Sequence, residues 1–123
     1  MKKFISVAVL VIGMLMCGNN VYAYDGNYAL YPTQNMWTFL KLDTRNGMID
    51  IVQYSVKGDE YRFEIPLNNM ALVDGISAKQ GRFTLTPTQN MYNFILLDTV
   101  NGSTWQVQWG TDMKANGMWK ISR

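Results

Sequence analysis

The chain lacks histidine altogether, and its single cysteine, Cys17, lies in an apolar segment near the N-terminus. Catalytic sites of the Ser-His-Asp or Cys-His type are therefore excluded, and so are zinc sites built on histidine or cysteine ligands. A disulfide framework is excluded as well, because it needs a second cysteine. No Gly-rich phosphate-binding loop is present either.

Long apolar runs are also missing, since none reaches the roughly 20 residues that a membrane-spanning helix needs. Two lysines precede the apolar stretch 4–16, and Val21-Tyr22-Ala23 places small residues at the −3 and −1 positions of a cleavage site after Ala23. This order of segments predicts a cleavable signal peptide at residues 1–23 rather than an uncleaved anchor. Met16 stands before Cys17, where lipid modification requires a small residue, which disfavours a lipoprotein.

The predicted mature chain has no excess of positive or negative charge. The formal charge of +2 comes from the two lysines of the signal, so residues 24–123 carry nine basic and nine acidic side chains. A neutral, mixed surface gives no reason to expect nucleic acid as a partner or stable membrane insertion after signal cleavage. We expect a periplasmic or secreted protein with a single domain over residues 24–123.

An internal repeat of about 55 residues is the main feature that is present. The repeats, 26–67 and 81–123, share Thr-Gln-Asn-Met at 33–36 and 88–91, and each then has an Asp-Thr-x-Asn-Gly turn. Alternating apolar and polar residues predict strands, and Asn-Gly predicts hairpins. No stretch of the mature chain shows helical periodicity.

The repeat predicts an all-β fold of two tandem four-stranded antiparallel meanders. We expect the meanders to pack as a sandwich or a barrel-like domain with pseudo-two-fold symmetry. A repeat of this size with four strands also matches a propeller blade, and two blades would close a ring only in an oligomer. The second strands carry apolar residues on both faces, which predicts cover on both sides, except that Lys41 in place of Leu96 predicts a more exposed face in the first repeat.

Three local predictions concern individual strands. Val52 and Tyr54 match Val107 and Trp109, so we expect all four to share an inner face. The fourth strand of the first repeat, Tyr61 to Leu67, should correspond to 118–123 with an offset of 56 residues. The segment 71–73 could add a short strand.

The segment 94–109, together with Pro-Thr-Gln-Asn-Met-Tyr at 87–92, resembles small, uncharacterised secreted proteins of Bacteroides-type bacteria. That resemblance implies an exported β protein and carries no activity with it. The Leu-Asp-Thr-x-x-Gly-x-x-Trp core also resembles blade motifs of quinoprotein-type propellers, in which it marks a hairpin and a packed tryptophan. Asp50, at the position of Trp105 in the second repeat, departs from both patterns.

Aromatic residues are the candidates for ligand contact. Trp37 and Tyr92 occupy equivalent places just after the Thr-Gln-Asn-Met corner, and exposed rings there could stack on sugars or anchor a protein. Gln53 and Gln108 recur on the strands as polar contacts or as solvated positions. Trp105 and Trp109 fit a small β core instead.

Asp43 and Asp98 are the most conspicuous carboxylates, and each lies at a hairpin corner. We expect both to bond backbone N–H groups in the turn rather than to act as acid and base. A calcium site at these turns would have too few oxygen ligands. We therefore assign no catalytic, metal or cofactor residues.

The sequence favours an exported, non-catalytic binding module whose partner is a protein or a carbohydrate. The alternative is a self-associating structural β protein of the cell envelope, because Lys41 replaces Leu96 and Asp50 replaces Trp105 on a face that a second copy could cover. A third hypothesis is a small hydrolase based on two carboxylates.

Overall fold

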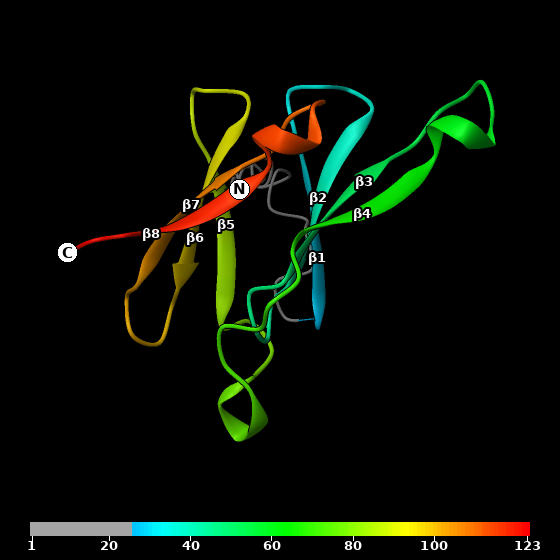
Figure 1. The fold of residues 1–123 in the computed structure, drawn as a ribbon. Coiled ribbons are helices and arrows are strands. Elements are labelled where there is room, and N and C mark those ends of the chain that lie inside the picture. The colour runs from blue at the N-terminus through cyan, green and yellow to red at the C-terminus, as the bar shows by residue number, and fades with distance from the viewer. Residues whose placement is uncertain (1–25) are drawn as a thin grey trace, which may run out of the picture.

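The computed structural model describes residues 26–123, so the predicted signal peptide lies outside the described residues. The described chain is all-β, as the repeat predicted (Figure 1). Its strands are β1 (Tyr28–Pro32), β2 (Thr38–Asp43), β3 (Ile49–Gln53), β4 (Phe63–Asn68), β5 (Phe83–Pro87), β6 (Asn93–Asp98), β7 (Thr104–Gln108) and β8 (Gly117–Ile121). Three short 3-10 turns interrupt the loops, namely η3 (Asp59–Tyr61), η4 (Gly75–Ser77) and η5 (Met113–Ala115).

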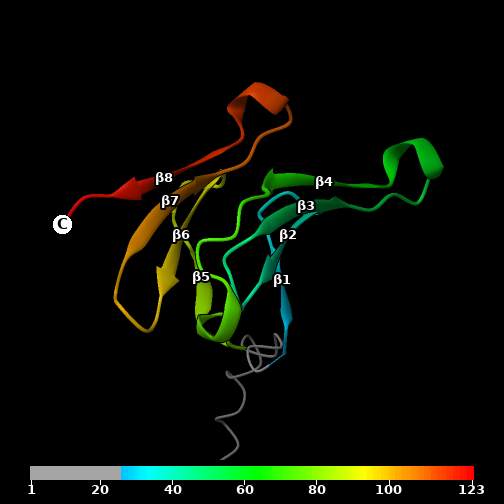
Figure 2. The ribbon, with the colours of Figure 1, turned by 60° about the horizontal axis from the view of Figure 1, so that its bottom comes forward.

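Each repeat forms its own four-stranded antiparallel meander, in the order β1-β2-β3-β4 for the first sheet and β5-β6-β7-β8 for the second. The first three strands of the two sheets start and end at positions exactly one repeat apart, which confirms the tandem meanders. The described strands remain two separate sheets and do not close into a barrel. The two sheets pack face to face. The edge strands β1 and β5 lie on one side of the molecule, and the edge strands β4 and β8 lie on the other (Figure 2).

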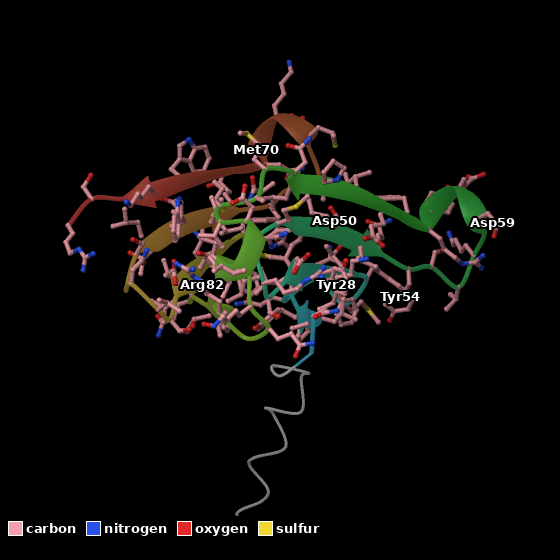
Figure 3. The ribbon with its side chains drawn as sticks, turned by 90° about the horizontal axis from the view of Figure 1, so that it is seen from below. Tyr28, Asp50, Tyr54, Asp59, Met70 and Arg82 are labelled. Atoms are coloured by element: carbon pink, nitrogen blue, oxygen red, sulfur yellow. The ribbon has the colours of Figure 1, made fainter. Side chains whose placement is uncertain are left out.

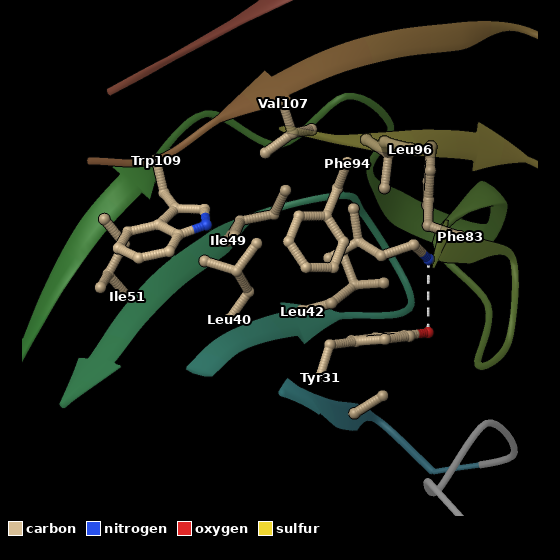
Figure 4. Packing of buried hydrophobic residues seen from close by; sticks show 12 residues of the cluster. Tyr31, Leu40, Leu42, Ile49, Ile51, Phe83, Phe94, Leu96, Val107 and Trp109 are labelled. Atoms are coloured by element: carbon tan, nitrogen blue, oxygen red, sulfur yellow. Dashed lines mark hydrogen bonds between the residues drawn. The ribbon is translucent and has the colours of Figure 1, made fainter. Parts of the chain in front are cut away.

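A shared apolar core lies between the two sheets (Figure 4). The first sheet contributes Ala29, Tyr31, Leu40, Leu42, Ile49 and Ile51. The second sheet contributes Phe83, Leu85, Phe94, Leu96, Val107 and Trp109. The hydroxyl of Tyr31 crosses this core and accepts a hydrogen bond from the backbone N–H of Leu85 at 3.3 Å. Burial of these side chains contributes most of the hydrophobic stabilisation of the folded state.

The two repeats bury opposite faces of the same strand pattern. In β2 the buried residues are Leu40 and Leu42, whereas in β6 they are Phe94 and Leu96, which are the equivalents of Phe39 and Lys41. A pseudo-two-fold axis would bring equivalent faces together, so the expected two-fold relation is wrong. The sheets are instead stacked in the same sense, with one face of the first sheet against the other face of the second.

The face reversal corrects two further expectations. Val52 is only half-buried and Tyr54 is exposed, although their equivalents Val107 and Trp109 lie in the core. β6 is not covered on both sides either, because Ile95 and its face of β6 are half-buried while the opposite face is fully buried. Both errors have one cause: the strand pattern is apolar on both faces, and the neighbouring sheet decides which face is covered.

The fourth strands differ from the prediction in register. Ile65 pairs with Ile51 in β4, and Trp119 pairs with Gln106 in β8, so Trp119 corresponds to Ile65. The offset is therefore 54 rather than 56, because the loop before β8 is one residue shorter than the loop before β4. Residues 71–73 form no strand.

The hairpin loops are longer than two-residue Asn-Gly turns. Each spans five residues between its strands and closes with Gly47 at φ 84° or Gly102 at φ 80°, where a side chain would be strained. Asp43 accepts the backbone N–H of Arg45 at 3.0 Å, and Asp98 accepts that of Val100 at 2.9 Å. The predicted turn bonding by both aspartates is confirmed.

Candidate functional site

The Thr-Gln-Asn-Met corner has the same hydrogen bonds in both repeats. Thr33 donates its hydroxyl to the carbonyl of Thr38 at 2.7 Å, and Thr88 donates to the carbonyl of Asn93 at 2.8 Å. The side-chain oxygen of the corner asparagine accepts the backbone N–H of the next aromatic residue at 2.9 Å in each copy. The corner thus fixes the backbone of Trp37 and Tyr92. It also explains why β2 and β6 begin one residue after these aromatics.

An aromatic pair follows each corner. Trp37 packs on Tyr54 and Tyr92 packs on Trp109, with ring centroids 5.1 Å apart in both pairs and interplanar angles of 55° and 57°. The backbone N–H of Tyr54 bonds the carbonyl of Trp37 at 3.1 Å, and that of Trp109 bonds Tyr92 at 2.9 Å. The large and small rings have exchanged positions between the repeats, but the geometry is preserved.

A pocket opens beside each aromatic pair. The pocket of the first repeat, called pocket A, has a volume of about 380 Å³ and is lined by Trp37, Gln53, Tyr54, Ser55, Val56, Lys57 and Tyr61. The pocket of the second repeat, called pocket B, has a volume of about 290 Å³ and is lined by Asn90, Tyr92, Asn93, Gln108, Trp109, Gly110, Thr111, Asp112 and Ala115. Tyr54 lies toward the end of the first sheet that carries η3 (Figure 3).

The structure brings the four candidate residues together two by two. Trp37 and Gln53 line pocket A, and Tyr92 and Gln108 line pocket B. Each glutamine also has a structural bond, because its amide nitrogen donates to the loop that follows the third strand. Gln53 bonds the carbonyl of Tyr61 at 3.1 Å, and Gln108 bonds that of Ala115 at 2.8 Å. These bonds hold the 3-10 turns over the pockets.

The ring partners Tyr54 and Trp109 were not among the predicted contacts. A sequence signal existed, because an aromatic residue stands 17 positions after Trp37 and again 17 positions after Tyr92. Two aromatics kept at one spacing in both copies indicate a cross-strand pair. We assigned both partners to the core, which holds for Trp109 but not for the exposed Tyr54.

The pockets differ in charge and in the hydrogen bonds of their walls. Pocket A contains Lys57, whereas pocket B has Asp112 at the equivalent position. Asp112 is partly engaged, since its carboxylate accepts the backbone N–H of Lys114 at 3.0 Å. Behind pocket B, Asn116 accepts the backbone N–H of Gly110, while its own amide nitrogen is buried without an acceptor among the described residues.

The two turn aspartates are each paired with an arginine. Arg82 bonds both oxygens of Asp98, at 3.0 and 2.9 Å, and Arg45 does the same for Asp43. Burial tends to raise the pKa of Asp98, but the Arg82 guanidinium and the turn N–H groups outweigh it and hold that pKa below its usual value. A carboxylate fixed in this way stabilises its turn, and its acceptor sites are largely occupied.

The outer face of the first sheet carries an acidic pair that the sequence did not single out. Desolvation and the hydrogen bond with Glu64 raise the pKa of Asp50 to about 6, although Lys41 opposes the shift. Lys41 forms an ion pair with Glu64 on the same face. In the second repeat the equivalents of Lys41 and Asp50 are Leu96 and Trp105, so this cluster belongs to one copy only.

Comparison of the chain with protein-family models, with curated proteins and with solved structures finds no match. Within residues 26–123 no group of three or more acidic side chains is placed to hold a metal ion. The same part of the chain has no helix of the length and apolarity that crossing a membrane requires.

Proposed function

We propose that the chain is an exported, non-catalytic binding module that takes its ligand at pockets A and B. The observation that carries the proposal is the repeated aromatic pair, which has the same centroid distance beside an equivalent pocket in each repeat. In the single chain Trp109 is buried while Tyr54 is 42% exposed. The geometry is kept even where the burial is not.

A carbohydrate is the ligand class that fits the pockets best. Their volumes lie near the lower end of the range for small-molecule sites, which suits one or two sugar rings. Aromatic faces pack against the apolar side of a sugar, and amide and hydroxyl groups bond its hydroxyls. A protein partner would need a much larger contact area than these pockets offer.

The pocket chemistry supports binding rather than catalysis. Hydrolysis of a glycosidic bond requires two carboxyl groups that flank the scissile bond. Asp112 is the one carboxylate among the lining residues, and its oxygen is engaged by a backbone N–H. Asp43 and Asp98 lie in the turns, bonded to arginines, and they line neither of these pockets.

The test is calorimetric titration of the exported protein with a panel of neutral oligosaccharides. Wild type should bind with two sites per chain. Trp37→Ala should remove the site in pocket A, and the double variant with Tyr92→Ala should weaken binding at least tenfold. Trp119→Ala is the matched control, since Trp119 is 53% exposed but lines neither pocket.

Two results would contradict the proposal. Unchanged affinity of the double variant would remove the aromatic pairs as the binding site. Absence of binding to every oligosaccharide in the panel would remove carbohydrate as the ligand class.

A further inference from the structure

The contact between the two sheets joins unlike faces. The face of the first sheet that contains Leu40 and Ile51 meets the face of the second sheet that contains Phe94 and Val107. By repeat equivalence these are opposite faces of one unit, so the joint is heterologous. Heterologous contacts leave one unsatisfied face of each kind at the two ends of the stack.

The two faces left outside are the counterparts of the two faces inside. We call the uncovered side of the first sheet face 1; its residues include Tyr28, Leu30, Phe39, Lys41, Val52 and Tyr54, which are equivalent to Phe83, Leu85, Phe94, Leu96, Val107 and Trp109 of the core. We call the uncovered side of the second sheet face 2; its residues include Thr84, Thr86, Ile95, Leu97, Thr104 and Gln106, which are equivalent to Ala29, Tyr31, Leu40, Leu42, Ile49 and Ile51.

Both faces expose large apolar side chains. On face 1, Tyr28 is 51% and Leu30 43% exposed, and Tyr28 and Asp50 project from the same sheet in Figure 3. On the side of face 2, Trp119 and Ile121 of β8 are exposed beside Gln106 and Thr104. Apolar groups mixed with hydroxyl, amide and paired charged groups are typical of interfaces between separately soluble chains.

The internal joint also shows which atoms would meet. Tyr31 bonds Leu85, and Thr44 accepts the backbone N–H of Phe83 at 2.9 Å. One repeat later, the equivalent positions are Thr86 with Leu30, and Thr99 with Tyr28; Thr86 is too short to repeat the tyrosine bond, so the backbone bond between Thr99 and Tyr28 is the one that can recur. All four of these residues are exposed in the single chain. The net charge of zero over residues 24–123 adds no repulsion between copies.

We propose that face 2 of one copy docks on face 1 of a second copy, head to tail, in the sheet orientation of the internal joint, with the Lys41–Glu64 ion pair of face 1 kept intact in the more polar interface. Repetition of a heterologous contact gives a closed ring of sheets when the rotation between successive sheets closes, and an open filament when it does not. Propellers have four to eight blades, so such a ring takes roughly two to four copies. Pocket B coexists with an occupied joint next to Trp109, so docking on face 1 leaves pocket A open in the same way.

The proposal is independent of the ligand and is tested by mass. Full-length protein, expressed with its own N-terminal segment and purified after export, is measured by light scattering over a dilution series. Wild type should form a complex of discrete mass that dissociates on dilution. Leu30→Arg blocks face 1 and Thr86→Arg blocks face 2, and each variant alone should be a monomer. Ile76→Arg, at a position that is 91% exposed in η4 and on neither face, should behave as wild type.

Mixing the two blocked variants identifies the polarity of the contact. Leu30→Arg keeps a free face 2 and Thr86→Arg keeps a free face 1, so the equimolar mixture should form a dimer of twice the monomer mass and nothing larger. Contact between two like faces would instead leave one variant dimeric by itself. That result overturns the proposal, as does a wild-type monomer at the highest soluble concentration.

A cross-linking measurement keeps the test decisive if an arginine variant fails to fold. The predicted mature chain contains no cysteine, so Leu30→Cys and Thr86→Cys can be introduced in separate copies without background reaction. A short bis-maleimide should join a mixture of the two variants into dimers far faster than it joins either variant alone. Equal rates in all three samples overturn head-to-tail docking.

Discussion

The first repeat buries the face of its second strand that carries Leu40 and exposes the face that carries Lys41, whereas the second repeat does the reverse at the same two positions. The substitutions follow the burial closely. Ile51, buried in the first copy, is Gln106 at the exposed position of the second, and the buried Leu96 is Lys41 in the first. One backbone pattern therefore supports two opposite packings, and the identity of a few side chains records which packing each copy has adopted.

The largest loss of stability should come from placing the charged residue of an exposed position at the equivalent buried position. Leu96→Lys gives the second repeat the residue that the first repeat carries, but at a position with 0% exposure. Burying the ammonium costs about 4–7 kcal/mol, the equivalent of a pKa shift of about 3–5 units, which is enough to unfold a marginally stable domain. Urea unfolding followed by tryptophan fluorescence measures the loss.

The reciprocal change, Lys41→Leu, is the matched control. It removes a surface ion pair with Glu64, and such pairs contribute at most about 1 kcal/mol. Similar losses for the two variants would contradict the assignment of opposite buried faces.

The second largest difference should separate the two partner rings. Trp109→Ala removes a buried ring whose indole N–H bonds the carbonyl of Met91 at 2.9 Å, and we expect a loss of about 3–5 kcal/mol. Tyr54→Ala, at the equivalent but exposed position, should cost less than about 1 kcal/mol in free energy of unfolding. Thermal melts of both variants provide the comparison, and equal melting temperatures would refute it.

The turn aspartates should differ by a smaller amount. Asp98→Asn weakens a buried pair with Arg82 and should cost about 1–3 kcal/mol at pH 7, while Asp43→Asn should cost less because Arg45 is more exposed than Arg82.

The pH dependence of the Asp98 variant is a second readout. Since the pKa of Asp98 is depressed in the folded chain, its contribution is present above the unfolded pKa and is lost as pH falls through the folded pKa. The difference between wild type and Asp98→Asn should therefore shrink below about pH 4. A constant difference down to pH 2 would show that the charge of Asp98 is not the cause.

The smallest effect should have the opposite pH sign. The pKa of Asp50 is raised to about 6, so its contribution is present below the unfolded pKa and is lost as pH rises through about 6. Asp50→Asn should remove this decline and gain stability relative to wild type between pH 4 and 7. Glu64→Gln, which removes the neighbouring carboxylate, should flatten the profile only in part, because the desolvation of Asp50 remains, and urea midpoints at several pH values give the readout.

Turns and corners were predictable from sequence because their chemistry is local. Thr33 and Asn35 bond within five residues of themselves, and Asp43 bonds within two, so the repeat of these residue types specified the same geometry twice. The class of fold followed from them and from the alternation between them.

The buried face and the last register were not predictable in this way. A strand that is apolar on both faces, such as 93–98, contains no information about where the neighbouring sheet lies. Sliding β8 by two residues leaves the alternation of Trp119 and Ile121 unchanged, so only the loop length decides the register. Trp37 and Tyr92 were found as candidates because they follow the corner. Their pocket partners required knowledge of the cross-strand neighbour.

The corners and meanders of each repeat form their hydrogen bonds without the other repeat, and this has a consequence for folding kinetics. Within each sheet, every strand pairs with its neighbour in sequence, without a crossover, so the ladders of each sheet need only short loop closures. The Thr33 and Thr88 corners close within five residues and need nothing from the other repeat. Each sheet can therefore organise its hairpins early, and the choice of face is made late, when one half-formed sheet meets another. At that moment a second chain can compete with the chain's own second half, so we expect a higher protein concentration during folding to favour exchange of whole repeats.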